Sequence, residues 1–244
     1  MSNIQKIVLI TGAARRIGAQ MAKTFHEEGY GVVIHYHNSN KEAEELAALL
    51  NVQRENSAWS VKADLQSLTQ IQRMVNEAVA KAGRLDVLIN NASTFYETPL
   101  ASASEGEWND LMGSNLKAPF FVSQAAFNAL KEAQGSIVNI VDIYAKRSLT
   151  NYPIYSTAKA GLYALTKSLA KELAPDVRVN AVSPGVILWP ENQSKEETEA
   201  VVKRIPLQRQ GSANDIAEMA LFLAKKANYI TGQVIAVDGG KSLL

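Results

Sequence analysis

The chain contains 244 residues, with 25 basic residues against 24 acidic ones and no cysteine. This balance offers no broad basic surface for nucleic acid, and the lack of cysteine excludes disulfides and thiol chemistry. No run approaches the roughly 20 apolar residues of a membrane-spanning helix, and no charged start precedes an apolar segment as in a secretion signal. We therefore expect a soluble, cytoplasmic protein with no nucleic-acid or membrane partner.

Apolar segments typical of strands alternate with amphipathic segments typical of helices along the whole chain. Strands are expected near residues 4–10, 31–35, 57–62, 85–90, 135–141, 177–183 and 233–238. Helices are expected near residues 16–28, 41–50, 68–82, 104–131 with a break, 154–173 and 213–224. This alternation favours an α/β fold in which residues 1–244 form a single doubly wound domain, with a sheet flanked by helices.

A glycine turn follows the first strand, with the sequence Thr11-Gly12-Ala13-Ala14-Arg15-Arg16-Ile17-Gly18. A strand, a glycine turn and a helix in this order direct free backbone N–H groups and the positive end of the helix toward a phosphate. The pyrophosphate of a dinucleotide is the natural ligand, although glycine turns also join strands to helices in α/β proteins that bind no nucleotide.

The loop after the second strand carries no acid, in the sequence Tyr36-His37-Asn38-Ser39-Asn40-Lys41. NAD enzymes usually place Asp or Glu here, against the ribose 2′-hydroxyl. His37 and Ser39 can instead donate hydrogen bonds to a 2′-phosphate, and Lys41 adds positive charge. The loop therefore favours NADPH over NADH, and the alternative is a polar loop with a helix cap at Ser39 or Asn40. No metal site is expected, because His35 and His37 have no third ligand nearby in the sequence.

Polar residues follow the later strands too. In an open parallel sheet the ligand lies beyond the carboxyl ends of the strands, so these residues should converge on one cleft. They are Asp64-Leu65, Asn90-Asn91-Ala92-Ser93-Thr94-Phe95-Tyr96, Asp142 and Ser183-Pro184-Gly185.

The interval from Val186 to Pro206 shows no clear element and carries Trp189-Pro190 before a charged run from Lys195 to Glu199. An interval of this kind near a cleft predicts a mobile substrate lid near residues 186–206. The alternative for its charged half is an ordinary solvated surface helix.

Two Tyr-x-x-x-Lys pairs occur, Tyr155 with Lys159 and Tyr163 with Lys167. Tyr155 begins the helix after the fifth strand, whereas Tyr163 lies two turns deeper, so only Tyr155 is expected to reach the cleft. An ammonium one turn away would lower the pKa of the Tyr155 phenol and make it a proton donor and acceptor near neutral pH. For Tyr163 and Lys167 we expect packing and solvation only.

The chain resembles the short-chain dehydrogenase/reductase family along essentially its whole length. The resemblance is carried by Thr11 to Gly18, Asn90-Asn91-Ala92, Asn115, Tyr155 with Lys159, Pro184-Gly185 and Val237-Asp238-Gly239-Gly240. It implies a Rossmann-type, mainly parallel sheet of about seven strands, a nicotinamide cofactor and a homotetramer. It also implies that Tyr155 is the catalytic acid, that Lys159 binds the nicotinamide ribose and that Asn115 supports a proton-relay water.

The cofactor contacts expected from the turns and from this resemblance are Arg16, Ile17, Tyr36, His37, Asn38, Ser39, Asp64, Leu65, Asn91, Ala92, Ser93, Tyr155, Lys159, Pro184, Gly185 and Ile187.

Two departures from the common pattern of the family point to a substrate. Most members carry glycine at the position of Arg16 and serine at the position of Asp142. A serine hydroxyl steadies a substrate carbonyl, whereas a carboxyl group can pass a proton to or from Tyr155. With residues 91–100 and 35–39, these departures resemble the pteridine reductase branch, which reduces biopterins and folates with NADPH.

In that branch a flat pterin would stack on Phe95, and Arg16 and Ser93 would bond its polar edge and the cofactor phosphates. Tyr155 would protonate a ring nitrogen and regain its proton through Asp142. The pterin side chain would project toward Trp189, and antifolates such as methotrexate should compete with the substrate. The alternatives are a hydrophobic plug for Phe95, a helix cap or a salt bridge to Lys146 or Arg147 for Asp142, and exposure to solvent for Arg16.

The predicted function is thus an NADPH-dependent pteridine reductase that acts on dihydropteridines such as dihydrobiopterin, with biopterin and folate or dihydrofolate as further candidate substrates. A dihydromonapterin reductase would share the Arg and Asp signature, and a carbonyl reductase would share the fold. A catalytically silent NADPH-sensing protein is the non-enzyme alternative, and the intact Tyr155 and Lys159 argue against it.

Overall fold

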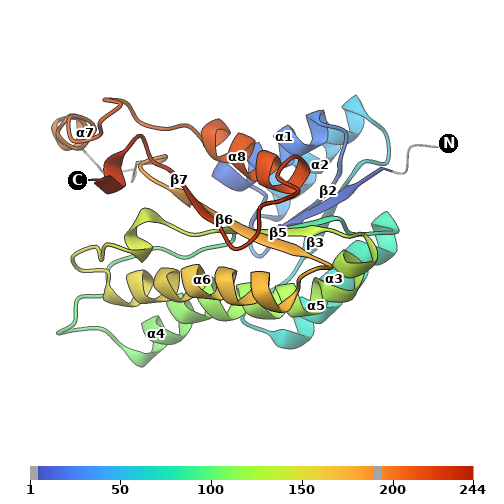
Figure 1. Cartoon of the computed structure of the whole chain (residues 1–244), viewed down its shortest axis with the longest axis horizontal. Helices are drawn as coiled ribbons and strands as arrows, with labels where there is room; N and C mark the ends of the chain where they lie inside the picture. The colour runs from blue at the N-terminus through green and yellow to red at the C-terminus, as the bar shows by residue number, and fades with distance from the viewer. Residues whose placement is uncertain (1–4, 190–193, 244) are drawn as a thin grey trace.

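Seven parallel strands form one sheet in the computed structural model, which describes residues 5–189 and 194–243 (Figure 1). The strands are β1 (Ile7–Ile10), β2 (Gly31–Tyr36), β3 (Ala58–Lys62), β4 (Val87–Asn90), β5 (Ser136–Ile140), β6 (Arg178–Pro184) and β7 (Val234–Val237). Their order in the sheet is β3-β2-β1-β4-β5-β6-β7. The α/β class and the parallel sheet expected from the sequence are confirmed, and the order reverses between β1 and β4, where a doubly wound sheet opens a binding crevice.

Helices cover both faces of the sheet (Figure 1). On one face lie α1 (Arg16–Glu27), α2 (Asn40–Gln53) and α8 (Ala213–Lys225), and on the other lie α3 (Leu68–Ala82), α5 (Ala118–Glu132) and α6 (Pro153–Glu172). Each layer buries its own apolar cluster against the sheet. Strands enclosed on both sides must be apolar throughout, which explains continuous runs such as Ile7-Val8-Leu9-Ile10.

The break expected within residues 104–131 is a π-helical turn, η1 (Gly113–Lys117), between α4 (Glu105–Met112) and α5. Single π turns inside α-helices are frequent at functional sites. Two short 3₁₀ helices, η2 (Ile143–Ala145) and η3 (Lys241–Leu243), follow β5 and β7. Both lie near the carboxyl edge of the sheet, because each follows the end of a strand.

The charged half of the interval 186–206 forms α7 (Lys195–Val202), which has no buried residue and begins with a capping box at Ser194. The alternative of a solvated surface helix therefore describes this half. Residues 190–193, including Pro190, lie outside the described residues. Across the described segments, no helix combines the length and the apolar character needed to cross a membrane.

Candidate active site

The glycine turn after β1 is joined directly to the segment after β4. The Nδ2 of Asn91 donates to the carbonyl oxygens of Thr11 and Gly12, at 2.8 and 3.0 Å. Gly12 has a φ of 63°, and a Cβ at this position would lie 3.0 Å from the Cα of Ala92. Glycine is therefore required both by the backbone conformation and by the close approach of the two segments.

His35 lies beneath this turn and was not among the predicted site residues. Its Nδ1 accepts from the backbone N–H of Gly12 at 3.0 Å, and its Nε2 lies 3.1 Å from the carbonyl oxygen of Ala63. Burial lowers the pKa of His35 to about 4, so the ring is neutral at pH 7. Because Nδ1 must accept, Nε2 carries the proton and donates to Ala63. A buried polar residue at the end of an apolar strand was the signal available in the sequence.

Arg16 has a left-handed backbone, with a φ of 56°, at the first residue of α1. Its side chain is exposed, which was the alternative expected for Arg16 from the sequence. It forms no hydrogen bond or ion pair with the described residues. Arg15 precedes it and provides no side-chain cap for α1. The first N–H groups of α1 thus remain available to an anion. Ile17, the next residue, is half-buried and packs against the core.

The loop after β2 presents exposed His37 and Asn38 and half-buried Ser39. Ser39 occupies the N-cap position of α2, but its hydroxyl forms no capping bond. The hydroxyl of buried Tyr36 donates to the side chain of Asn40. Lys41 forms an ion pair with Glu45 at 3.8 Å, so its charge is partly engaged within α2.

Asp64 and Leu65 follow β3 and lie half-buried at the same edge of the sheet. The Oδ1 of Asp64 accepts from the backbone N–H of Gln66 at 2.9 Å. Leu65 packs against the core on the α3 side. These contacts hold the loop without using Asp64 in an ion pair among the described residues.

The phenol of Tyr155 donates to the Oδ2 of Asp142 at 2.8 Å. The other carboxylate oxygen, Oδ1, accepts from the backbone N–H of Tyr144 at 2.9 Å and caps η2. Asp142 is therefore a helix cap, which was one of the alternatives expected from the sequence. Its carboxylate also binds Tyr155, the candidate catalytic acid. It forms no salt bridge with Lys146 or Arg147 in the described chain.

Lys159 is buried one turn further along α6, and its Nζ donates to the carbonyl oxygen of Ile140 at 3.0 Å. Burial lowers the pKa of Lys159 to about 8, and the charge of Asp142 opposes this. The ammonium thus lies between the end of β5 and the Tyr155 ring, whose centre is 5.7 Å away.

The expected lowering of the Tyr155 pKa is wrong for this structure. Burial raises the pKa of the phenol well above 10, and the carboxylate of Asp142 raises it further. Burial also raises the pKa of Asp142 above its ordinary value. The prediction rested on the nearby ammonium and left out the burial of the phenol and the carboxylate in contact with it. The shared hydrogen bond raises the pKa of its donor, Tyr155, and lowers that of its acceptor, Asp142, but burial outweighs the second effect.

Asn115 is fully buried in the π turn. Its Oδ1 accepts from the hydroxyl of Ser93 at 2.6 Å, and its Nδ2 donates to the carbonyl oxygen of Thr94 at 3.0 Å. Through these bonds Asn115 holds the segment after β4 rather than Tyr155 itself. Ala92, at the start of this segment, donates its N–H to the Thr11 hydroxyl at 3.0 Å.

Phe95 is 49% exposed, which excludes a buried plug. Its ring stacks on Tyr152 with centroids 4.6 Å apart and meets the Tyr155 ring edge-on at 4.8 Å. Tyr152 was not among the predicted site residues. It is the N-cap residue of α6, and its position three residues before Tyr155 could have identified it as a neighbour of that side chain.

Tyr163 lies apart from this arrangement, as expected. The ammonium groups of Lys146 and Lys167 are each 4.9 Å from its ring centre. The hydrogen bond to Lys167 lowers the pKa of Tyr163. This second pair therefore resembles the first in sequence, but among the described residues its tyrosine has no carboxylate partner, and the pKa of Tyr163 is shifted in the opposite direction to that of Tyr155.

The segment after β6 is held by backbone contacts. Gly185 donates to the carbonyl oxygen of Val237 at 3.0 Å, and a Cβ on it would lie 2.6 Å from the Cα of Asp238.

Gln210 donates to the carbonyl oxygen of buried Ile187 at 2.6 Å and accepts from the Nε1 of Trp189 at 2.7 Å. Trp189 is therefore held by Gln210 and has no bond to Phe95, Asp142 or Tyr155. Pro184 ends β6 and is buried.

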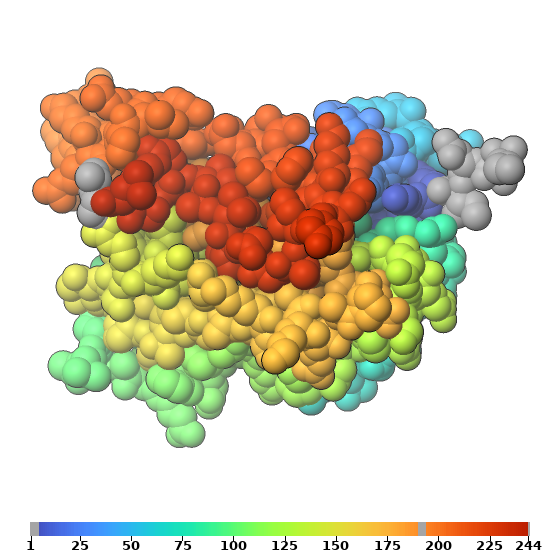
Figure 2. Space-filling view, viewed as in Figure 1, coloured from blue at the N-terminus to red at the C-terminus, as the bar shows by residue number. Residues whose placement is uncertain are grey.

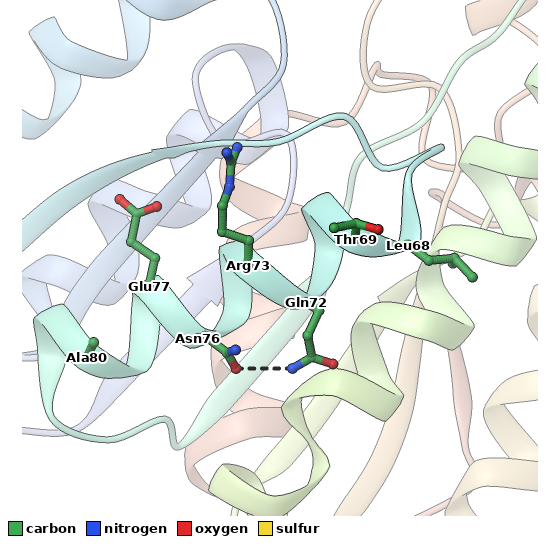
Figure 3. A pocket seen from close by; sticks show the side chains of 7 residues that line it. All are labelled: Leu68, Thr69, Gln72, Arg73, Asn76, Glu77 and Ala80. Atoms are coloured by element: carbon green, nitrogen blue, oxygen red, sulfur yellow. Dashed lines mark hydrogen bonds between the residues drawn. The ribbon is translucent and has the colours of Figure 1, made fainter.

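A separate depression of about 810 Å³ lies on the outer face of α3 (Figure 3). All seven side chains that line it come from this one helix, and Gln72 donates to Asn76 along it at 3.0 Å. It contains none of the predicted site residues. Nor do the described residues contain a group of three His, Asp or Glu side chains able to hold a metal ion.

Comparison with known proteins places this site in a family. A family model described as Enoyl-(Acyl carrier protein) reductase matches residues 12–242. Pteridine reductase 1 of Leishmania tarentolae is 39% identical over 97% of this chain and 96% of its own length. The 3-oxoacyl-[acyl-carrier-protein] reductase FabG of Staphylococcus aureus is 37% identical over 96% of this chain and 97% of its own length. FabG of Thermotoga maritima is 38% identical over the same shares.

The two kinds of relative are about equally similar, so these matches do not decide the substrate. They do extend over nearly the whole chain, and they agree with the seven-stranded parallel sheet. The chain belongs to the short-chain dehydrogenase/reductase family of oxidoreductases.

Proposed function

We propose that the protein is an NADPH-dependent pteridine reductase that transfers hydride to dihydropteridines such as dihydrobiopterin. Fully oxidised pterins and folates are further candidate substrates. The observation that carries the proposal is the 2.8 Å hydrogen bond from Tyr155 to Asp142. The relative named Pteridine reductase 1, at 39% identity, supports the same choice.

The proton balance of the reaction explains the importance of this bond. Hydride added to the carbon of a ring C=N bond leaves electron density on the nitrogen, which must receive a proton. Tyr155 donates that proton, and Asp142 returns one to the phenol along their hydrogen bond. The raised pKa of Asp142 favours its protonated, donating form. A catalytic acid that is fully buried otherwise lacks a direct supply of protons from water.

The residues present fit a phosphorylated dinucleotide. The uncapped start of α1 and the left-handed Arg16 can receive a pyrophosphate. Ser39 has a hydroxyl free of capping bonds, and the exposed loop 37–39 contains no carboxylate that would repel a 2′-phosphate. Lys159 would hold the nicotinamide ribose. The cofactor supplies the hydride when it is bound.

The aromatic pair suits a flat substrate. The half-exposed Phe95 lies edge-on to Tyr155, so a ring stacked on Phe95 would have its edge near the phenol. Methotrexate, which contains a diaminopteridine ring, should compete for this place. Ser93 and Arg16 would bond the polar edge of the ring, and Trp189 in the proposed lid at 186–206 would face the pterin side chain. We also propose a homotetramer, as the family resemblance implies.

The FabG relatives favour a ketone reductase as the second candidate. A dihydromonapterin reductase would use the same Tyr155 and Asp142 and would differ only in the side chain of the pterin. Asp142 argues against ketone reduction, because both of its carboxyl oxygens are already engaged, by the Tyr155 phenol and the Tyr144 N–H. No O–H group is left there to donate to a substrate carbonyl, as the serine common in the family does.

The decisive experiment measures NADPH oxidation with 7,8-dihydrobiopterin and with an acetoacetyl ester, in the wild type, Asp142→Asn and Asp142→Ser. We expect dihydrobiopterin turnover in the wild type, inhibition by methotrexate and a loss of roughly 10²-fold in Asp142→Asn, since the amide cannot pass the proton. Asp142→Ser should not restore the activity. Full pteridine activity in Asp142→Asn would contradict the proton relay. Turnover of the ester alone would support a ketone reductase, and no turnover of either would support an NADPH-sensing role.

A further inference from the structure

A pocket of about 520 Å³ lies where three segments far apart in the sequence meet. The segment after β5 contributes Ile143, Tyr144, Arg147 and Ser148. Arg204 lies two residues after the end of α7, and η3 contributes Lys241 and Ser242. In Figure 2 the red C-terminal residues lie between the orange surface of α7 and the yellow-green surface after β5. The pocket is therefore assembled by the fold and not by one helix.

The lining of this pocket is strongly cationic. Arg147, Arg204 and Lys241 supply three positive charges, Ser148 and Ser242 supply hydroxyls, and no carboxylate from residues 5–189 or 194–243 lines it. In the parts of the chain that the structure describes, none of the three cations forms an ion pair.

The acidic side chain nearest in sequence to Lys241 is that of Asp238, and both of its oxygens already accept hydrogen bonds. Its two oxygens accept from the backbone N–H groups of Gly240 and Ser242, at 2.9 and 2.7 Å, which shapes the turn that carries Lys241. Arg147 donates to the carbonyl oxygen of Lys241 at 3.5 Å and links the two segments. Lys241 is half-buried, and burial together with the charge of Arg204 lowers its pKa. Like charges held together in this way favour a bound anion.

The pocket adjoins the proton relay. Ile143 and Tyr144 line the pocket and directly follow Asp142, whose Oδ1 accepts from the Tyr144 N–H. Burial raises the pKa of the Tyr144 phenol, and the charge of Asp142 raises it further. The cofactor phosphates are expected elsewhere, at the Gly12 turn and at Ser39, so the pocket is available to the substrate.

We propose that this pocket binds an anionic group, a carboxylate or a phosphate, on the tail of a substrate whose reacting ring lies against Tyr155 and Asp142. The inference rests on the proposed function and deepens it. It assigns Arg147, Arg204 and Lys241 to substrate specificity, in favour of pteridines with a charged tail, such as a glutamate or a phosphate ester, over those with an uncharged side chain.

The test compares two substrates that share a ring and differ in the charge of the tail. Dihydrofolate carries two carboxylates on its tail, and 7,8-dihydrobiopterin carries none. In Arg204→Gln and Lys241→Gln we expect KM for dihydrofolate to rise at least about tenfold, or about 1.4 kcal/mol, with kcat unchanged. KM for dihydrobiopterin should not change. Added salt should reduce the advantage of dihydrofolate in the wild type, because exposed charges are screened.

The matched control is Lys203→Gln, which removes the same charge from the exposed neighbour of Arg204 without altering the pocket lining. An equal rise of KM for both substrates, no rise for either, or the same rise in Lys203→Gln would overturn the proposal.

A binding measurement separates this proposal from the proposed function. If the wild type reduces neither substrate, the proposed function fails, and the pocket is then tested by calorimetric titration with 4-aminobenzoyl-glutamate and with tripolyphosphate. We expect at least one probe to bind the wild type about tenfold more tightly than the Arg204→Gln/Lys241→Gln double variant. The probe that binds identifies the anion as a carboxylate or a phosphate, and equal binding of both probes to both proteins would refute the subsite.

Discussion

His35 should make the stability of this protein fall in mild acid. Its pKa is about 4 in the folded protein, because burial opposes the charged ring, whereas an unfolded histidine has a pKa near 6.5. A folded pKa below the unfolded value means that the contribution is fully present above pH 6.5 and is lost as the pH falls toward 4. A gap of about 2.5 pH units corresponds to about 3 kcal/mol. His35 is the buried acceptor of the Gly12 N–H, so this loss of stability should act on the glycine turn after β1.

The perturbation is His35→Asn, in which the Oδ1 of asparagine can still accept from Gly12 but no titration occurs in this range. Urea unfolding at a series of pH values between 4 and 8 gives the free energy of unfolding for both proteins. We expect the wild type to lose about 3 kcal/mol more than the variant between pH 7 and pH 4. His26 also has a pKa lowered by burial, but it is present in both proteins, so the difference isolates His35.

The control is His37→Asn, two residues later on the exposed loop, which should retain the wild-type dependence on pH. Parallel curves for the wild type and His35→Asn would show that the buried ring does not remain neutral, and the assignment of its proton to Nε2 would then fail.

Two further predictions concern the acid and the cofactor. Tyr155→Phe should lower steady-state turnover by roughly 10²-fold or more and leave NADPH binding nearly unchanged. The control is Tyr163→Phe, which removes the hydroxyl of the tyrosine near Lys146 and Lys167 and should keep turnover near normal. Equal losses in the two variants would mean that Tyr155 is not the catalytic acid. Because Ser39 and His37 can donate to a 2′-phosphate, kcat/KM should favour NADPH over NADH at least tenfold, about 1.4 kcal/mol. Asn38→Asp should reduce this ratio by charge repulsion, and an unchanged ratio would place the 2′-phosphate elsewhere.

The sheet could be predicted from the sequence because its strands are apolar on both faces and each is followed by a helix. A mainly parallel sheet of about seven strands was implied by the family resemblance, and the structure adds the order of the strands, β3-β2-β1-β4-β5-β6-β7. Boundaries moved by a few residues, as in α2, which continues to Gln53 rather than ending near residue 50. The charged run after Ser194 has helical propensity and a capping box, which were the local signals for α7.

Contacts between segments were harder to foresee. The family resemblance implied that Asp142 passes a proton to Tyr155, and the two side chains are in contact. The expected shift of the Tyr155 pKa is reversed mainly by the burial of the phenol and further by the charge of Asp142. The stacking of Tyr152 on Phe95 and the hydrogen bond that His35 accepts from Gly12 were not predicted from the sequence. Each depends on the relative position of residues that are distant in the chain, which neither periodicity nor spacing encodes.

The conformation of Arg16 connects these observations to binding. A non-glycine residue with a φ of 56° costs about 1 kcal/mol relative to glycine, and α1 also begins without a side-chain cap, which typically contributes about 1 kcal/mol. Both costs fall on the same turn, where a bound phosphate would satisfy the free N–H groups and the guanidinium together. An anion bound there stabilises the folded protein in proportion to the logarithm of its concentration over Kd. Arg16 departs from the common family pattern, and a phosphate bound at this turn would offset the local cost of its backbone conformation.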